Sequence, residues 1–239
     1  MIAKLIKILT GRDYAIGAGD LGYMLSKGAV PTVRGLAWSM LHLRRWRGVM
    51  LGPNIQWVMS GRIRTGRGVL IGGFSYVDGS ARDGIVLEDR VTIREHAWIQ
   101  GRSGLNDPAE GLWIGAHSYI GPRAVIGIGG PIRIGSGVQA GAGLTITAEA
   151  HAPDEGGSFV SGRTERRGVR IGDRCWLGNN VSILDGVDIG DDCVIGANSL
   201  VTRSIPPGSM AFGTPARVQK RVSGAHGPAL GDSEQPRHR

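Results

Sequence analysis

The sequence is poor in the features that mark secreted, membrane-spanning and nucleic-acid-binding proteins. No uninterrupted apolar run reaches the roughly 18 residues of a membrane span. Residues 1–9 alternate lysine with aliphatic residues and have neither the apolar core nor the cleavage site of a signal peptide. The formal charge is +8, but no recognised nucleic-acid-binding motif accompanies it. We therefore expect a cytoplasmic protein that does not bind nucleic acid.

What the sequence does contain is a six-residue repeat near its C-terminal end. Neither a helix, with a period of 3.6, nor an open sheet, with a period of 2, gives this spacing. It is typical of a triangular coil in which one apolar residue points inward on each flat side, so that eighteen residues complete one turn. The recurring apolar positions are Ile171, Leu177, Ile183, Ile189, Ile195 and Val201.

The same spacing extends toward the N-terminus with interruptions, in coils that begin at Leu51, Leu87, Ile114 and Ile134. Two longer segments, 101–112 and 152–169, are rich in Gly, Pro and charge, and we interpret them as loops that leave the coil. The 41 glycines fit the same architecture, because tight corners need backbone conformations that a Cβ disfavours. The fold class predicted is therefore all-β, a parallel β-helix over residues 49–222.

The repeat also explains the scarce cysteines, of which there are 2 in the chain. Cys175 and Cys193 are eighteen residues apart and should lie one above the other in successive coils. In a cytoplasmic chain we expect two buried thiols that fill a narrow core rather than a disulfide. Asn180 and Asn198 share the same separation, which predicts a hydrogen-bonded amide stack at one corner.

The two ends of the chain differ from the repeat. Residues 1–48 are strongly basic, and Val33–Arg47 has helical spacing of its apolar residues. We interpret this short helical segment as a cap over the open end of the coil, while contact with an anionic membrane surface is a second interpretation compatible with the first. Residues 223–239 combine Gly, Pro and charge without periodicity, which predicts a disordered tail.

His151 is the first candidate catalytic residue. It ends the coil that begins at Ile134 and opens the longer of the two loops. A histidine held where the chain leaves a rigid face suits a general base, since the pKa of imidazole lies near 6.5. From position alone, a structural or merely exposed histidine is an equally good interpretation.

The run from Ile171 to Val218 resembles the C-terminal signature of the hexapeptide-repeat acyltransferases, in the branch of galactoside, maltose and polysaccharide O-acetyltransferases. The resemblance is dense over about seventy residues, from Ile146 onward, and extends to the rest only through the repeat. It is specific for the family and weakly specific for the substrate. The matching parts are Trp176-Leu-Gly, Ile195-Gly-Ala, Val201-Thr, Ile205-Pro-Pro and Gly213-Thr-Pro-Ala-Arg.

This resemblance implies a left-handed β-helix, a homotrimer with active sites between subunits, acetyl-CoA as donor and no metal. His151 matches the position of the family's catalytic histidine, which would take the proton from an acceptor hydroxyl. The backbone N–H of Asn179 occupies the position of the oxyanion donor. Glu149 is a candidate for orienting the imidazole, although a backbone carbonyl would serve equally well.

The donor site is expected along the C-terminal coils. Trp176 offers a flat face to pantetheine or acetyl, and small residues at a corner would let the thin pantetheine chain approach the backbone. Cationic residues near the end of the chain are candidates for the coenzyme A phosphates, with a solvated basic surface as the alternative. The candidate cofactor-binding residues are Trp176, Gly178, Ala197, Thr202, Arg203, Arg217 and Lys220.

The sequence departs from the small-sugar enzymes in two respects. Where they are expected to carry an acceptor-binding Asn, this chain has Ile120-Gly-Pro-Arg-Ala-Val, with Arg123 nearest. Their helical N-terminal lobe is also not recognisable. We therefore expect a larger carbohydrate acceptor, such as a lipopolysaccharide or surface-polysaccharide precursor. Candidates either for binding the coenzyme A phosphates or for attracting an acidic glycan are Arg163, Arg166 and Arg167.

Other functions remain open at this point. N-acetylation of an amino sugar and O-acetylation of serine use the same chemistry. A zinc site like that of a γ-class carbonic anhydrase would need three converging histidines, and His96, His117 and His151 have poor spacing for it. A scaffold without catalytic activity would leave the position of His151 unexplained.

Overall fold

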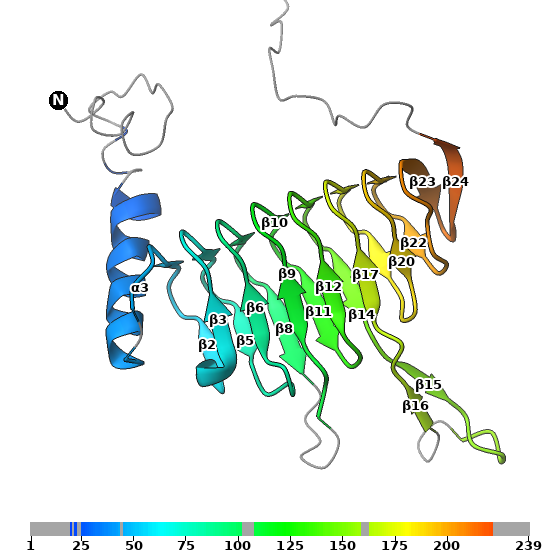
Figure 1. Cartoon of the computed structure of the whole chain (residues 1–239), viewed down its shortest axis with the longest axis horizontal. Helices are drawn as coiled ribbons and strands as arrows, with labels where there is room; N and C mark the ends of the chain where they lie inside the picture. Colours follow the sequence, from blue (N-terminus) through cyan, green and yellow to red (C-terminus); the bar gives the residue numbers. More distant parts are fainter. Residues whose placement is uncertain are drawn as a thin grey trace, which may run out of the picture.

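The chain forms one long three-sided coil (Figure 1). The computed structural model describes residues 20, 22, 25–43, 45–101, 108–158 and 163–221. Each turn of the coil contributes one short strand to each of three parallel sheets, which we name sheets I, II and III in chain order. The fold class is a left-handed parallel β-helix of hexapeptide repeats, as predicted.

The strands of the coil are two to six residues long and pair in register from one turn to the next. Sheet I contains β1 (Met50–Leu51), β4 (Leu70–Ile71), β7 (Thr92–Ile93), β10 (Tyr119–Ile120), β13 (Gln139–Ala140), β18 (Trp176–Leu177), β21 (Val194–Ile195), β23 (Ser209–Gly213) and β24 (Ala216–Arg221). Sheet II contains β2 (Gln56–Val58), β5 (Tyr76–Asp78), β8 (Trp98–Gly101), β11 (Val125–Ile128), β14 (Thr145–Thr147), β19 (Ser182–Ile183) and β22 (Leu200–Val201). Sheet III contains β3 (Ile63–Thr65), β6 (Ile85–Leu87), β9 (Leu112–Ile114), β12 (Ile132–Ile134), β17 (Val169–Ile171) and β20 (Asp188–Ile189).

The core is a stack of the apolar residues that the repeat predicts. In sheet III, for example, Ile134 pairs with Ile171 and Ile171 pairs with Ile189, and all three are at most 1% exposed. At most corners the chain turns in three or four residues, and many corner residues adopt a positive φ, including the non-glycine residues Asn180 and Asn198. The amide of Asn180 donates to Asn198 Oδ1 at 3.1 Å, which confirms the predicted amide stack.

The N-terminal end of the coil is capped by a helix. A π-helical turn, η1 (Leu25–Ala29), leads into α3 (Val30–Leu41), which lies across the first coil (Figure 1). The buried Trp38 packs against Trp57 of the first coil, with 5.2 Å between ring centroids. The helix begins and ends earlier than the predicted Val33–Arg47, since Pro31 suits the first helical turn and the chain is extended by residue 45 to enter β1. No helix among the described residues has the length and hydrophobicity to cross a bilayer.

The other end is closed by an antiparallel pair, β23 and β24, which folds back along sheet I (Figure 1). A short 3₁₀ turn, η2 (Ser60–Arg62), forms the first corner between sheets II and III. A two-stranded antiparallel hairpin, β15 (Ala150–Ala152) and β16 (Arg163–Glu165), leaves the coil at a later corner of the same kind. The predicted tail at 223–239 and most of residues 1–24 lie outside the described residues.

The two cysteines lie in the core, as predicted, and both are free thiols. Cys175 donates to the carbonyl oxygen of Gly190 and Cys193 to that of Pro206, each at 3.1 Å. The neighbouring Cys193 sulfur, together with burial, raises the pKa of the Cys175 thiol above its ordinary value.

We therefore expect the folded protein to release no thionitrobenzoate when mixed with Ellman's reagent, because the reagent cannot reach either sulfur. After unfolding in guanidinium chloride, both thiols should react. Rapid reaction of one thiol in the native protein would show that the C-terminal coils open locally.

Candidate active site

The site residues predicted from the sequence lie at corners of the coil. We name each corner by the sheets it joins, so that the chain passes the I/II, II/III and III/I corners in every turn. Because the three corners run along three separate edges, residues at different corners are separated by the width of a sheet. The corner occupied by each residue therefore decides which residues can meet within one protomer.

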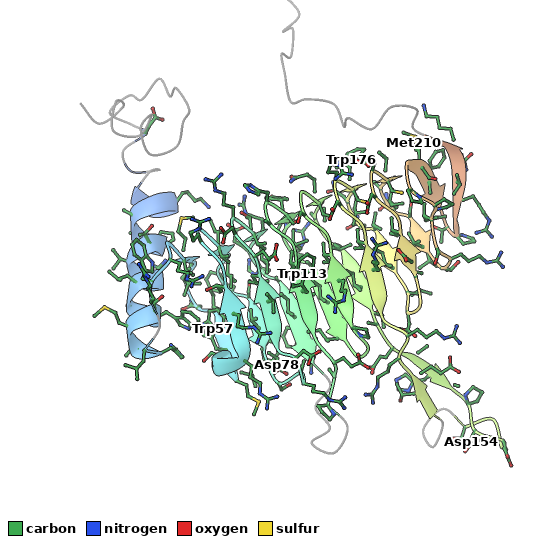
Figure 2. The ribbon with its side chains drawn as sticks, viewed as in Figure 1. Trp57, Asp78, Trp113, Asp154, Trp176 and Met210 are labelled. Carbon is green, nitrogen blue, oxygen red and sulfur yellow. The ribbon has the colours of Figure 1, made fainter. Side chains whose placement is uncertain are left out.

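His151 lies at the II/III corner, on the projecting hairpin. It follows β14 of sheet II, and in the hairpin it pairs with Thr164 of β16. Its side chain is exposed, and it makes no hydrogen bond with the described part of the chain. Figure 2 shows the hairpin extending away from the coil, with Asp154 near its tip. No described residue of its own protomer closes over the exposed imidazole, so within that part of the chain it is open to a substrate or a second subunit.

No hydrogen bond or ion pair joins Glu149 to His151 in the described part of the chain. Glu149 packs against Gly129 of the preceding coil, where an added Cβ would come within 2.6 Å of the Glu149 Cβ. Its Oε2 is buried and has no hydrogen-bond partner among the described residues. A role for Glu149 in orienting the imidazole stays a prediction that the isolated protomer does not support.

Asn179 lies at the I/II corner, and its environment follows from a ladder of hydrogen bonds along the coil. In several turns, the N–H of the second residue after a strand donates to an Asp or Asn side chain in the next coil. These bonds run from Arg67 to Asp89 at 2.8 Å, from Ser136 to Asp173 at 2.8 Å, from Ala142 to Asn179 at 2.8 Å and from Asp173 to Asp191 at 3.0 Å.

The N–H of Asn179 itself has no such partner. The residue in the matching position of the next coil is Ala197, whose methyl group cannot accept a hydrogen bond. Both residues are exposed, and this N–H donates to no acceptor in the described part of the chain. An exposed donor on a rigid corner is suited to stabilise negative charge on a bound substrate. The missing acceptor can be found in the sequence by comparing residues eighteen apart, since Ala197 stands where other turns have Asp or Asn.

The remaining cofactor candidates divide between two edges of the coil. Trp176 is 56% exposed on the outer face of sheet I, at the edge of the molecule opposite to the hairpin (Figure 2). Arg217 and Lys220 are exposed on β24 of the same sheet, and Ala197 lies at the I/II corner. Thr202 and Arg203 follow β22 and lie at the II/III corner, like His151.

Gly178 has a structural explanation. It is buried, and a Cβ at this position would approach the backbone nitrogen of Ala197 to 2.5 Å. Glycine is therefore needed for the two coils to stack at this corner. A direct contact between Gly178 and coenzyme A stays a prediction.

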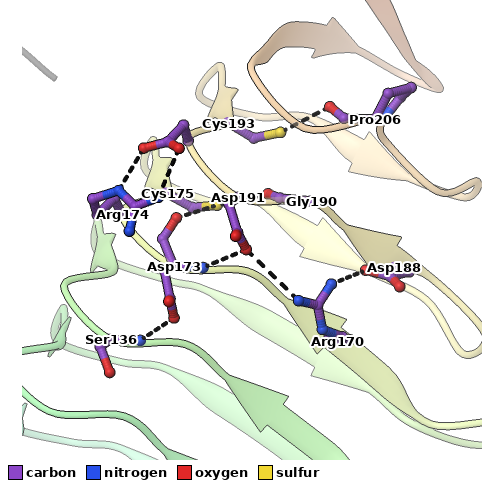
Figure 3. A network of polar contacts seen from close by, with 11 residues as sticks. Ser136, Arg170, Asp173, Arg174, Cys175, Asp188, Gly190, Asp191, Cys193 and Pro206 are labelled. Carbon is purple, nitrogen blue, oxygen red and sulfur yellow. Dashed lines mark hydrogen bonds and ion pairs between the residues drawn. The ribbon is translucent and has the colours of Figure 1, made fainter. Parts of the chain in front are cut away.

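Near the III/I corner, a network of ion pairs and hydrogen bonds joins two arginines to aspartates of the next coil (Figure 3). Arg174 forms a bidentate pair with Asp192, with both N–O distances 2.7 Å, and the pair raises the pKa of Arg174. Arg170 pairs with Asp188 at 2.9 Å and reaches Asp191 at 3.6 Å. By contrast, no described carboxylate pairs with Arg203, Arg217 or Lys220. These three cations are therefore available for the phosphates of a ligand.

The structure does not bring the three histidines of the zinc alternative together. His96 lies at a I/II corner, His117 at a III/I corner and His151 at a II/III corner. Over the described residues there is no group of three His, Cys, Asp or Glu side chains placed to hold a metal ion. His96, His117 and His151 therefore form no zinc site within one protomer.

Comparison with known proteins places these repeats in a family. Residues 168–203 match the family model of the bacterial transferase hexapeptide (six repeats), and residues 111–148 match that of the hexapeptide repeat of succinyl-transferase. The chain is 42% identical to Nodulation protein L of Rhizobium meliloti (strain 1021) over 106 residues, which are 44% of this chain and 57% of that protein. It is 47% identical over 59 residues to the putative lipopolysaccharide biosynthesis O-acetyl transferase WbbJ of Escherichia coli (strain K12), covering 25% of this chain and 30% of the relative.

A solved structure supports the fold. The UDP-N-acetylglucosamine acyltransferase of Arabidopsis has a TM-score of 0.50 at 17% identity, over 73% of this chain and 64% of that one. The chain matches less than two thirds of the length of these curated relatives, so activity and substrate do not pass directly from them to this protein. The six-residue repeat, the three-sided coil and the matched segments together show that residues 111–148 and 168–203 carry hexapeptide repeats of the kind found in bacterial transferases.

Proposed function

We propose that this protein is an acetyl-CoA-dependent O-acetyltransferase that acts on a carbohydrate hydroxyl, in a surface-polysaccharide or lipopolysaccharide precursor. The observation that carries the proposal is the distribution of the candidate residues over two edges of the coil. His151, Thr202 and Arg203 lie at the II/III corner, whereas Asn179 and Ala197 lie at the I/II corner. A base and an oxyanion donor on opposite sides of sheet II cannot serve one substrate within a protomer, but they can serve it between two protomers.

The two corners define how a trimer would assemble. In a closed threefold ring, the II/III corner of each protomer must lie beside the I/II corner of its neighbour for His151 and Asn179 to meet. Since sheet II lies between these corners, all three copies of sheet II then face the symmetry axis. Each outer crevice is bounded by sheet III of one protomer and sheet I of the next, with the catalytic groups at its base.

The surface of sheet II supports this arrangement. Trp98 and Val125 are large apolar residues that are 47% and 44% exposed in the protomer. In the second outward position of β5, Asp78 pairs with Val58 and is 5% exposed. The first outward residues of the seven strands include no charged side chain, as expected of a surface that is buried on assembly. They are Gln56, Tyr76, Trp98, Val125, Thr145, Ser182 and Leu200.

Replacing Val125 by arginine is therefore expected to turn the trimer into monomers, because it would place three guanidinium groups around the threefold axis without counter-charges. Light scattering coupled to size-exclusion chromatography measures the mass. The matched control is Val86→Arg, the same change on sheet III, which should leave the trimer intact. A trimer that survives Val125→Arg but not Val86→Arg would mean that another sheet faces the axis.

The chemistry follows from the two catalytic groups. The neutral imidazole of His151 removes the proton of the acceptor hydroxyl as its oxygen attacks the thioester carbonyl carbon. The carbonyl oxygen becomes an oxyanion, which accepts a hydrogen bond from the N–H of Asn179 of the neighbouring protomer. Collapse of the intermediate breaks the carbon–sulfur bond, and the imidazolium returns its proton to the coenzyme A thiolate.

The donor would lie along the C-terminal half of the crevice. Trp176 and Ala197 would contact the acetyl group and pantetheine on the wall formed by sheet I. Arg217 and Lys220 on that wall, with Arg203 from the facing corner, would neutralise the phosphates. Thr202 lies beside Arg203 and would line the same part of the crevice.

The experiment that tests this function is transfer of labelled acetyl from acetyl-CoA to a panel of acceptors. The panel holds polysaccharide fragments, lipid-linked oligosaccharides, amino sugars and serine. We expect an alkali-labile acetyl ester on a carbohydrate. Label on an amino group, or on serine, would instead favour the alternative acceptors that share this chemistry.

A further inference from the structure

We propose that the outer face of sheet III binds an anionic segment of the acceptor glycan. This inference rests on the proposed function, because it names the chemical class of the acceptor. The outward row of sheet III differs from those of sheets I and II in its charge. It reads Arg64, Val86, Trp113, Arg133, Arg170 and Asp188, whereas the matching row of sheet I is Met50, Leu70, Thr92, Tyr119, Gln139, Trp176, Val194 and Met210.

This face carries a hollow of about 410 Å³, which we call the sheet III groove. Three arginines contribute to its walls, and Trp113 contributes an aromatic face, while Asp83 is the one acidic residue among the described residues that line it. The floor and ends are made by small and apolar residues of three successive coils. The lining residues are Arg64, Arg82, Asp83, Gly84, Val86, Gly111, Leu112, Trp113, Pro131, Ile132 and Arg133.

The arginines of the groove are not neutralised by the described part of the chain. Neither Arg82 nor Arg133 has an ion-pair or hydrogen-bond partner for its guanidinium group there, and Arg64 donates only to the backbone oxygen of Asp83, at 3.3 Å. Arg170 and Arg174, farther along the coil, are by contrast fully paired. Exposed guanidinium groups around a hollow are suited to bidentate binding of carboxylate or phosphate groups.

The shape of the groove favours a chain over a single anion. Arg64 and Arg133 lie on strands β3 and β12, which are three steps apart in sheet III. At the usual strand spacing this separation is about 14 Å, longer than one phosphate or one sugar. Trp113 pairs with Val86 on one side and Arg133 on the other, so its half-buried ring lies between the charged ends. An aromatic face with flanking cations suits a sugar ring with acidic groups on its neighbours.

The groove also lies where an acceptor chain would have to pass. Pro131 at its end accepts a hydrogen bond from the N–H of Val169, at 2.9 Å, where the chain returns from the His151 hairpin. The groove is thus one coil from the base of that hairpin, on the wall of the crevice that faces sheet I of the next protomer. It lies toward the N-terminal end, whereas the cations proposed for coenzyme A lie toward the other end. Donor and acceptor would therefore approach the hairpin from opposite directions.

The test is a binding measurement that does not depend on catalysis. Isothermal titration of the full-length protein with an oligogalacturonide of about six units should show binding that weakens with added salt. Neutral malto-oligosaccharides of the same length should bind at least about tenfold more weakly. The double variant Arg82→Ser, Arg133→Ser should lose at least about tenfold in affinity for the oligogalacturonide, as expected when guanidinium–carboxylate pairs are removed.

Two controls show whether glycan binding belongs to the sheet III groove. Arg34→Ser removes an exposed charge from α3, outside the groove, and should leave oligogalacturonide affinity unchanged. Coenzyme A should bind the double variant as it binds the wild type. Equal binding of neutral and acidic chains, an effect of Arg34→Ser equal to that of the double variant, or lost coenzyme A affinity with unchanged glycan affinity would each overturn the proposal. Failure of acetyl transfer with intact oligogalacturonide binding would count against the proposed activity and not against the groove.

Discussion

Replacement of His151 by alanine should lower kcat for acetyl transfer by about 10²–10⁴-fold, the usual contribution of a general base. The imidazole is exposed on a hairpin that projects from the coil, so its removal should leave the coil unchanged. Affinity for acetyl-CoA should stay close to that of the wild type. Steady-state kinetics with the acceptor found in the panel, together with a titration of coenzyme A, measures both quantities.

The matched control is His117→Ala, which removes an exposed histidine at a III/I corner. It should retain wild-type kcat, since this histidine lies at neither catalytic corner. Near-normal turnover by His151→Ala would show that another group accepts the proton, and equal losses in both variants would point to a general effect on folding.

Replacement of Ala197 by aspartate should lower kcat by about 10²–10³-fold, the cost of losing one oxyanion donor. In the ladder of the coil, a carboxylate at this position would accept the hydrogen bond of the Asn179 N–H, as Asp191 accepts that of Asp173. The oxyanion would then lose its donor and meet a negative charge. The fold should be retained or slightly stabilised, because the variant completes a hydrogen bond that other turns already contain.

Ala142→Asp is the control for this variant. It adds the same charge at the same I/II edge, two coils earlier, but the matching residue of the preceding coil is Pro122, which has no N–H to occupy. We expect near-normal kcat for Ala142→Asp. If both aspartates lower kcat equally, the loss comes from charge repulsion of the substrate rather than from the capped donor.

Much of the fold follows from the sequence because the repeat has one physical cause. A side chain that points inward every six residues must be apolar, and the corner that follows must be tight, so Ile134, Ile171 and Ile189 could be assigned to the core without a structure. The interruptions are less regular. The phase of the first coils shifts. Leu51 and Ile63 are buried as expected, whereas Trp57 is only partly buried and packs against Trp38 of α3.

The site was less predictable, since it depends on which edge of the coil each residue occupies. The six-residue repeat assigns His151 and Asn179 to adjacent coils. Only the assignment of strands to sheets shows that the two residues lie on opposite sides of sheet II. Among the described residues, the N–H of Asn179 is free because the matching residue of the next coil, Ala197, has no side-chain acceptor. A sequence motif names the residues that are present and does not predict a missing hydrogen bond. The sheet III groove combines residues from four separate strands, and no local pattern predicts it.

The most direct test of a site shared between subunits is complementation between two inactive variants. His151→Ala and Ala197→Asp would be co-expressed with different tags, and the mixed trimers would be purified through both tags in succession. Every mixed trimer then contains one crevice with an intact His151 facing an intact Asn179 corner, so activity should return to about one third of the wild-type value. Mixed trimers as inactive as either parent would contradict the account, because they would place both groups in a single protomer.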